Sequence, residues 1–172
     1  DPILAGFTDE TAYAGVPAEE GLLVINVGDH AAHRYPNPRA GDQIDTDDGN
    51  DLLVIERGYD ANEIFVTSMG FRQRYTGVQA IRIQGGAGND TIEIEDGITL
   101  PVYVDGGAGD DRITTSRGAA AVFGGEGNDT IVLGTADGNV VDAGAGDDRV
   151  IGSTRDDEVH GGLVLHPAGG VR

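Results

Sequence analysis

Aspartate closes a short glycine-rich stretch that recurs along this chain. The first full copy reads Gly85-Gly86-Ala87-Gly88-Asn89-Asp90 and leads straight into alternating apolar and polar residues. Carboxylates and backbone carbonyls are the oxygen ligands that Ca²⁺ prefers, and glycine lets carbonyls turn inward because it has no Cβ to obstruct them. Three further copies follow, at Gly106-Gly107-Ala108-Gly109-Asp110-Asp111, Gly124-Gly125-Glu126-Gly127-Asn128-Asp129 and Ala143-Gly144-Ala145-Gly146-Asp147-Asp148.

The copies are spaced regularly. An incomplete copy, Thr46-Asp47-Asp48-Gly49-Asn50-Asp51, precedes the others and keeps the last three positions. The final aspartates of successive copies lie 39, 21, 18 and 19 residues apart. A fixed period of this length is typical of a solenoid. Because 39 is close to two periods, we predict an intervening coil whose turn has lost the motif.

The apolar residues keep the same period. Large aliphatic residues stand two places after each final aspartate, and others stand two places before each glycine pair. Within a coil, as in Thr91-Ile92-Glu93-Ile94-Glu95, apolar and polar residues alternate as in a half-buried strand. The pattern predicts an all-β fold, a parallel β-helix or β-roll with 18 to 21 residues per coil. The two predicted ladders are Leu53, Ile92, Ile113, Ile131 and Val150, and Ile83, Val104, Val122, Val141 and Val159.

Only one edge of this predicted solenoid carries the motif. The other turns, near residues 95–100, 116–118, 135–139 and 153–156, vary in length and share no pattern. Stacked coils place equivalent residues about 4.8 Å apart, so two successive motif loops can share one cation. Their all-oxygen ligands suit calcium better than zinc or magnesium, and the chain has no cysteine.

The repeated stretch resembles the calcium-binding repeats of RTX (repeats-in-toxin) proteins, whose pattern is G-G-x-G-x-D-x-U-x with U large and apolar. Three copies match every fixed position, and the fourth departs only at Ala143, where we expect some loss of backbone freedom. The resemblance covers about residues 41–165. It implies an extracellular module that is secreted or held at the cell surface, leaves a bacterium by type I secretion, and folds on meeting calcium.

The resemblance also assigns ligands. It implies that Asp90, Asp111, Asp129 and Asp148 bind calcium through their side chains, with Asp51 a weaker candidate beside a coil that lacks the motif. The remaining loop residues would supply carbonyls, and Asn89, Asp110, Asn128 and Asp147 would supply carbonyls or tune the loop. Three ions are expected, between loops 85–90 and 106–111, 106–111 and 124–129, and 124–129 and 143–148. A fourth or fifth would use Asp51 or the Asp156-Asp157 end.

Composition excludes several classes of partner. The chain has 30 acidic and 11 basic residues, a net charge of −19, so a nucleic-acid partner is not expected. No apolar run is long enough to span a membrane, and the first residues lack the regions of a signal peptide. We therefore expect an export signal elsewhere or a chain that is part of a longer protein. The expected domains are an N-terminal cap or irregular β segment (1–40) holding one strand near Leu22–Val27, the repeats (41–165) and a tail (166–172).

Other interpretations remain open. A β-helix can carry a polysaccharide lyase or epimerase, for which Arg72, Arg74 and Tyr75 would bind sugar near the turn without a motif. Open coils could also stack end to end into a filament or adhesin stalk with other domains or copies as partners. No catalytic constellation is identifiable, so we expect no enzyme. Residues 45–56 faintly resemble an EF-hand loop, and residues 29–33 could hold a transition metal, but a degenerate repeat loop and a polar loop are preferred.

Overall fold

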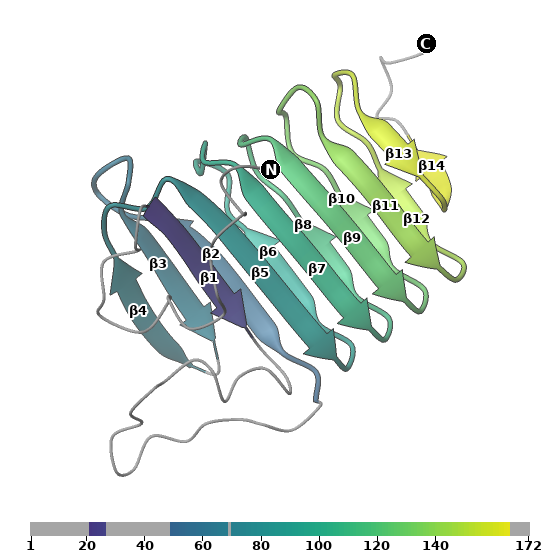
Figure 1. The fold of residues 1–172 in the computed structure, drawn as a ribbon, viewed down its shortest axis with the longest axis horizontal. Coiled ribbons are helices and arrows are strands. Elements are labelled where there is room, and N and C mark those ends of the chain that lie inside the picture. The colour runs from purple at the N-terminus through teal and green to yellow at the C-terminus, as the bar shows by residue number, and fades with distance from the viewer. Residues whose placement is uncertain (1–20, 27–48, 69, 166–172) are drawn as a thin grey trace.

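The structure, a computed structural model, describes residues 21–26, 49–68 and 70–165, and its elements there are strands without an α-helix (Figure 1). This confirms the predicted all-β class. The strands are β1 (Leu22–Asn26), β2 (Leu52–Arg57), β3 (Ile64–Ser68), β4 (Phe71–Tyr75), β5 (Ala80–Ala87), β6 (Thr91–Ile94), β7 (Val102–Ala108), β8 (Arg112–Thr114), β9 (Ala120–Glu126), β10 (Thr130–Val132), β11 (Val140–Ala145), β12 (Arg149–Ile151), β13 (Glu158–His160) and β14 (Leu163–Leu165).

Two sheets face each other across the core. One has the order β1-β5-β7-β9-β11-β13 and is parallel throughout, and the other has the order β14-β12-β10-β8-β6-β2-β3-β4. From β5 onward the chain alternates between the sheets, so each coil holds one strand of each, as Figure 1 shows. The result is the predicted β-solenoid of the β-roll kind, with the motif loops along one edge.

Both predicted ladders form the core. Ile92, Ile113, Ile131 and Val150 are at most 1% exposed on one sheet, and Ile83, Val104, Val122 and Val141 are fully buried on the other. Each ladder is one inward position repeated on neighbouring strands, as in the pairing of Ile92 with Ile113. Branched aliphatic side chains suit these positions because they pack well on a pleated surface with few rotamers to lose.

The predicted extra coil between Asp51 and Asp90 is wrong. Strand β2 pairs directly with β6, with Leu53 opposite Ile92, so the two coils are neighbours. The additional residues form the antiparallel hairpin β3–β4, which extends the second sheet beyond β2. Arg72, Arg74 and Tyr75 therefore lie on strand β4 and not at a turn. A hairpin strand and a degenerate coil strand show the same alternation of apolar and polar residues, so periodicity could not separate them.

The ends of the array are also described in part. The predicted strand near Leu22 is β1, and it pairs in parallel with β5 as the first strand of its sheet. At the other end, β13 and β14 add one coil after the last motif loop, joined by Gly161 and Gly162 in left-handed conformations. The remainder of the predicted cap, the EF-hand-like residues 45–48, the histidines at 30 and 33, and the tail 166–172 lie outside the described residues.

Candidate metal centre

The motif loops stack in register along one edge of the roll (Figure 1). The second glycines of the four copies are direct partners on neighbouring strands, Gly86 with Gly107, Gly107 with Gly125, and Gly125 with Gly144. Each loop starts inside the end of a long strand and finishes at the aspartate that precedes the next short strand. Equivalent atoms of successive loops therefore face each other.

The final aspartates form a ladder of hydrogen bonds. The backbone N–H of Asp90 donates to Oδ1 of Asp111 at 2.8 Å, that of Asp111 to Asp129 at 2.8 Å, and that of Asp129 to Asp148 at 2.9 Å. The N–H of Asp51 likewise donates to Oδ1 of Asp90 at 2.8 Å. One oxygen of each carboxylate thus holds the preceding coil in register.

The second oxygen of each carboxylate has no partner. Oδ2 of Asp90, Asp111, Asp129 and Asp148 is buried without a hydrogen bond, and the four residues are 1 to 4% exposed. A buried carboxylate oxygen without a partner is strongly unfavourable, because the charge has lost its water. Four equivalent unsatisfied oxygens in one row are suited to binding a cation.

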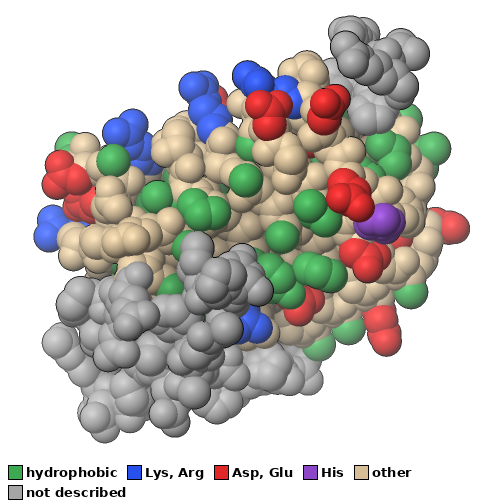
Figure 2. Space-filling view, turned by 45° about the horizontal axis from the view of Figure 1, so that its top comes forward, with side chains coloured by type: hydrophobic (Ala, Val, Ile, Leu, Met, Phe, Trp, Pro, Cys, Tyr) green, Lys and Arg blue, Asp and Glu red, His purple; other side chains and the backbone are tan. Residues whose placement is uncertain are grey.

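The protein itself supplies no cation to this row. None of the ion pairs among the described residues includes one of these four aspartates. The opposite edge differs, because Arg117 pairs with Asp96 of the preceding coil and Arg155 pairs with Asp137 in the same way, at 2.7 and 2.8 Å. Basic side chains gather along that side in Figure 2. Acidic turns are thus neutralised by arginine on one edge only.

Backbone carbonyls converge on the same places. A Cβ added to Gly106 would stand 2.5 Å from Oδ2 of Asp111 and 2.5 Å from the carbonyl oxygen of Gly124 in the next loop. Equivalent positions at Gly85 and Gly124 meet Oδ2 of their own loop's aspartate and the next loop's carbonyl in the same way. The first glycine therefore keeps open a small oxygen-lined cradle between loops.

The oxygen atoms that could bind a metal in this cradle are backbone carbonyls together with one carboxylate from each loop. Among the described residues, no group of three or more His, Cys, Asp or Glu side chains comes together to hold a metal. A mixed set of carbonyls and carboxylates is what Ca²⁺ accepts, while zinc sites in proteins are built mainly from histidine nitrogen and cysteine sulfur. The residues present therefore fit calcium.

Comparison with known protein families also indicates a calcium-binding repeat. Residues 82–97, 103–131 and 133–163 match the RTX calcium-binding nonapeptide repeat in four copies. Residues 82–163 carry RTX calcium-binding repeats. No curated protein and no solved structure matches the chain. The match confirms the predicted family of the repeats and supports calcium as the ion.

The RTX motif departs at Ala143, and the structure explains why an alanine fits there. The first positions of the loops do not have left-handed backbones, unlike the second and fourth glycines, so the expected loss of backbone freedom is not the issue. At Gly106 and Gly124 a methyl group would collide with the next RTX loop. Ala143 has no motif loop after it, and Cβ positions built on Gly161 and Gly162 lie 3.5 and 3.4 Å from its methyl carbon, an ordinary contact.

Asp51 lies beside an RTX loop, which corrects the reason for ranking it below the others. Its neighbour is loop 85–90, since Asp51 donates its N–H to Asp90 and the N–H of Asn89 donates to Oδ1 of Asn50 at 2.8 Å. A Cβ on Gly88 would lie 2.2 Å from the carbonyl oxygen of Gly49. Residues 49–51 thus stack on the first full motif as the RTX loops stack on each other, while residues 46–48 lie outside the described part.

The acidic end at Asp156-Asp157 is not brought to the RTX edge. The side chain of Asp157 accepts hydrogen bonds from Asn139 Nδ2 at 2.8 Å and from the N–H of Ser153 at 2.7 Å. Asn139 is fully buried and also accepts the N–H of Ala120 at 3.1 Å. Asp157 therefore acts in a polar network that joins the turns of the opposite edge.

A second, exposed ladder runs beside the RTX aspartates. The N–H of Asp110 donates to Oδ1 of Asn89, that of Asn128 to Asp110, and that of Asp147 to Asn128, at 2.7 to 2.9 Å. Its bonds run in the opposite direction along the roll to those of the buried ladder. The side chains at this position are exposed and are used for loop-to-loop bonding, which fits the predicted tuning of the loop.

The pKa values of Asp90, Asp111 and Asp129 are raised. Burial raises the pKa of Asp111 from 3.8 to about 7, opposed by the hydrogen bond from Asp90 and assisted by the neighbouring carboxylates. Burial likewise raises the pKa of Asp90 to about 6 and raises that of Asp129. At a pH between the ordinary and the raised pKa values, the folded calcium-free loops therefore hold protons that the unfolded chain has released.

The sign of this shift predicts how pH acts on the calcium-free protein. Groups with a raised pKa in the folded state stabilise it fully below their ordinary pKa, and the contribution disappears as pH rises to the folded pKa. We expect the calcium-free fold to lose stability from about pH 4 to pH 7, and calcium binding near pH 6 to release protons. Melting with chelator across this range, and calcium titration in buffers of different ionisation enthalpy, measure both effects. A calcium-free melting temperature that rises between pH 4 and 7 would contradict this reading.

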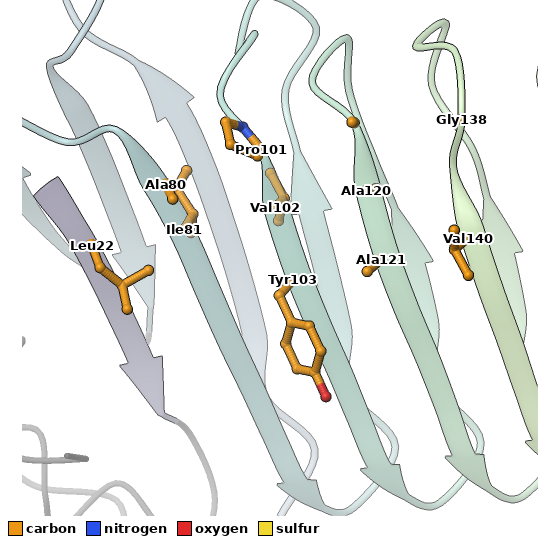
Figure 3. A pocket seen from close by; sticks show the side chains of 11 residues that line it. Leu22, Ala80, Ile81, Pro101, Val102, Tyr103, Ala120, Ala121, Gly138 and Val140 are labelled. Atoms are coloured by element: carbon orange, nitrogen blue, oxygen red, sulfur yellow. The ribbon is translucent and has the colours of Figure 1, made fainter. Parts of the chain in front are cut away.

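The outer face of the first sheet has a shallow apolar pocket of about 220 Å³ (Figure 3). Its floor consists of small residues such as Ala80, Ala120 and Ala121, and Tyr103 and Val140 lie along it. Its lining has no carboxylate or histidine, and the phenol of Tyr103 is its one titratable side chain, so the pocket brings together no pair of acid and base groups.

The residues suggested for sugar binding are already engaged. Arg72 pairs with Glu56 at 2.9 Å and lies over the ring of Phe65 at 3.9 Å, and Arg74 lies 3.3 Å from the buried Glu63. These contacts join the hairpin strands to β2 and to each other. Arg72 and Arg74 could therefore bind an acidic sugar only by breaking an ion pair.

Proposed function

We propose that this protein is a non-catalytic, calcium-dependent structural module of the RTX kind that works outside the cell. The observation that carries the proposal is the row of four buried aspartate oxygens without partners, held in register between stacked loops. Bound calcium would supply the positive charge that these oxygens lack and would tie each loop to the next.

The geometry supports three sites between the four full loops. Asp90, Asp111 and Asp129 each face a carbonyl of the following loop, at Gly106, Gly124 and Ala143 respectively. Asp51 and Asn50 make loop 85–90 a candidate for a further site on its other side. Asp148 has no motif loop after it, so its free oxygen belongs to the end of the row.

The role of the protein residues is to order oxygens that repel one another. The hydrogen bond from each aspartate N–H fixes the next carboxylate, and the glycines let carbonyls approach within the strand spacing. Because these oxygens converge only when the coils stack, ion binding and folding are coupled. An unfolded chain would bind calcium only weakly. Where calcium is scarce, the chain would therefore remain unfolded.

Location outside the cell is supported by chemistry. A site of the RTX type has few carboxylate ligands. Such a site is expected to bind calcium weakly and to fill at the high calcium concentration of extracellular fluid. Among the described residues there is no helix that could cross a membrane. A rigid spacer or a segment that folds after export fits a rod of stacked coils whose stiffness depends on the ion.

Replacing Asp111 by asparagine tests the ligand role separately from the hydrogen-bond ladder. Asp111→Asn keeps an oxygen for the N–H of Asp90 but removes the unpartnered charged oxygen. We expect the calcium-free fold to become more stable, while calcium affinity falls at least about tenfold, or about 1.4 kcal/mol. Calorimetric titration with calcium, and melting with calcium or chelator, give both quantities.

The matched control is Asp110→Asn. Asp110 is the neighbouring, exposed residue of the same loop, and asparagine stands at the equivalent position in two other loops, at 89 and 128. Both substitutions change the net charge equally. If they alter calcium binding equally, the buried oxygen is not a ligand and only overall charge matters, and the proposal fails.

A further inference from the structure

The two ends of the roll differ in the exposure of their side chains. At the N-terminal end, Leu22, Leu23, Val24 and Ile25 of β1 are 1 to 5% exposed on both faces of the strand, and β3–β4 extends the second sheet beyond β2. At the C-terminal end β13 and β14 terminate their sheets (Figure 1), and Leu163 and Leu165 are 63% and 36% exposed. The apolar side chains of the edge strand β1 are therefore buried, whereas the C-terminal end presents exposed apolar side chains among the described residues.

The backbone at this edge has donors and acceptors pointing outward. The N–H of Glu158 donates to Asn139 on the β11 side, and the N–H of Leu163 donates to Asp148 on the β12 side. Because alternate residues of a strand face opposite neighbours, the N–H and C=O of Val159 and Val164 point away from the roll. Edges of this kind are templates for another strand.

The edge is complementary to itself. If β13 meets a second β13 antiparallel with Val159 on the twofold axis, the two valines exchange both hydrogen bonds and Glu158 lies opposite the other copy's His160. If β14 does the same about Val164, each exposed Leu163 lies opposite a Leu165. Val159 and Val164 are the end positions of the two facing core ladders, paired with Val141 and Val150, so one axis can pass through both.

We propose that the roll dimerises tail to tail through β13 and β14, with a second copy of this chain as the partner. Such a contact uses the same patch on both copies and closes after two. An end-to-end filament would instead need an N-terminal edge that matches this one. There the first sheet ends one strand beyond β5, at β1, whereas the second extends three strands beyond β6, through β2, β3 and β4, so the two ends are not complementary. The contact joins only two short strands per copy, so we expect a weak, concentration-dependent dimer.

The dimer is tested in calcium-containing buffer on the whole chain. Sedimentation equilibrium should show a species approaching twice the 17.8 kDa chain mass as concentration rises. Leu163→Lys with Leu165→Lys places like charges opposite each other and should return a monomer. Leu52→Lys is the matched control, because Leu52 is 55% exposed on the same sheet but far from this edge.

Cysteine pairs test the register. The chain has no cysteine, so Leu163→Cys and Leu165→Cys can be made singly without interference. Under mild oxidation a mixture of the two variants should form a disulfide-linked dimer, whereas neither variant alone should do so. A folded protein, as judged by circular dichroism, that remains monomeric or cross-links equally in every combination would overturn the proposal. That result would leave the calcium proposal untouched, because the roll would still be folded.

Discussion

Removing calcium at neutral pH should abolish most of the β structure of this protein. The four aspartate oxygens without partners lie in one buried row, and the pKa of Asp111 is raised to about 7. At neutral pH these carboxylates must either hold protons, repel one another or bind a cation. The calcium-free roll is therefore opposed by charges that the bound ion would neutralise.

The expected size of this effect is comparable with the total stability of a domain. An ion present at 100 times its dissociation constant stabilises a fold by about 2.7 kcal/mol per independent site. Three such sites would contribute about 8 kcal/mol, against about 5–15 kcal/mol for the net stability of a typical domain. Chelation should thus move the protein from mostly folded to mostly unfolded.

Far-ultraviolet circular dichroism during calcium titration and chelation measures this directly. The signal of β structure should appear with calcium, disappear with chelator and return on readdition. Magnesium at the same concentration is the control, since its small octahedral shell fits a carbonyl-rich loop poorly. Chelated protein that keeps both its spectrum and its melting temperature would show that the roll does not depend on the ion.

Replacing Gly106 by alanine should strongly destabilise the stacked motif loops. The new methyl carbon would stand 2.5 Å from the carbonyl oxygen of Gly124 and 2.5 Å from Oδ2 of Asp111. Neither atom can retreat, because one is backbone in a stacked loop and the other is a buried ligand candidate. We expect a loss of about 3 kcal/mol of stability together with weakened calcium binding on both sides of the loop.

The control for this prediction is already present in the chain. Ala143 occupies the equivalent first position, but the coil after it has no motif loop, and Cβ positions built on Gly161 and Gly162 would lie 3.5 and 3.4 Å from its methyl carbon. Ala143→Gly should therefore change stability by less than about 1 kcal/mol, the ordinary backbone effect of glycine. Chemical denaturation in calcium measures the free energy of unfolding of both variants. A Gly106→Ala protein as stable as Ala143→Gly would show that the first glycine is not needed to keep the oxygen-lined cradle open.

Much of this protein was determined by its sequence alone, because the same residues recur at nearly the same spacing. The period places Ile92, Ile113, Ile131 and Val150 on one inward ladder, and the structure buries all four. The glycines and the closing aspartate predict stacked loops with oxygen ligands, and the family match confirms the repeats. Repetition makes local pattern and tertiary contact equivalent here, since each coil packs mainly on its neighbours.

Tertiary structure decided what repetition could not. The 39 residues between Asp51 and Asp90 contain an antiparallel hairpin and not a second coil, and this makes Asp51 a direct neighbour of a motif loop. The space around Ala143 depends on the next coil and not on its own motif. The direction of the two aspartate oxygens, one bonded and one free, follows from how the loops stack. Each of these depends on which segments become neighbours, and spacing along the chain does not specify that once an insertion interrupts the period.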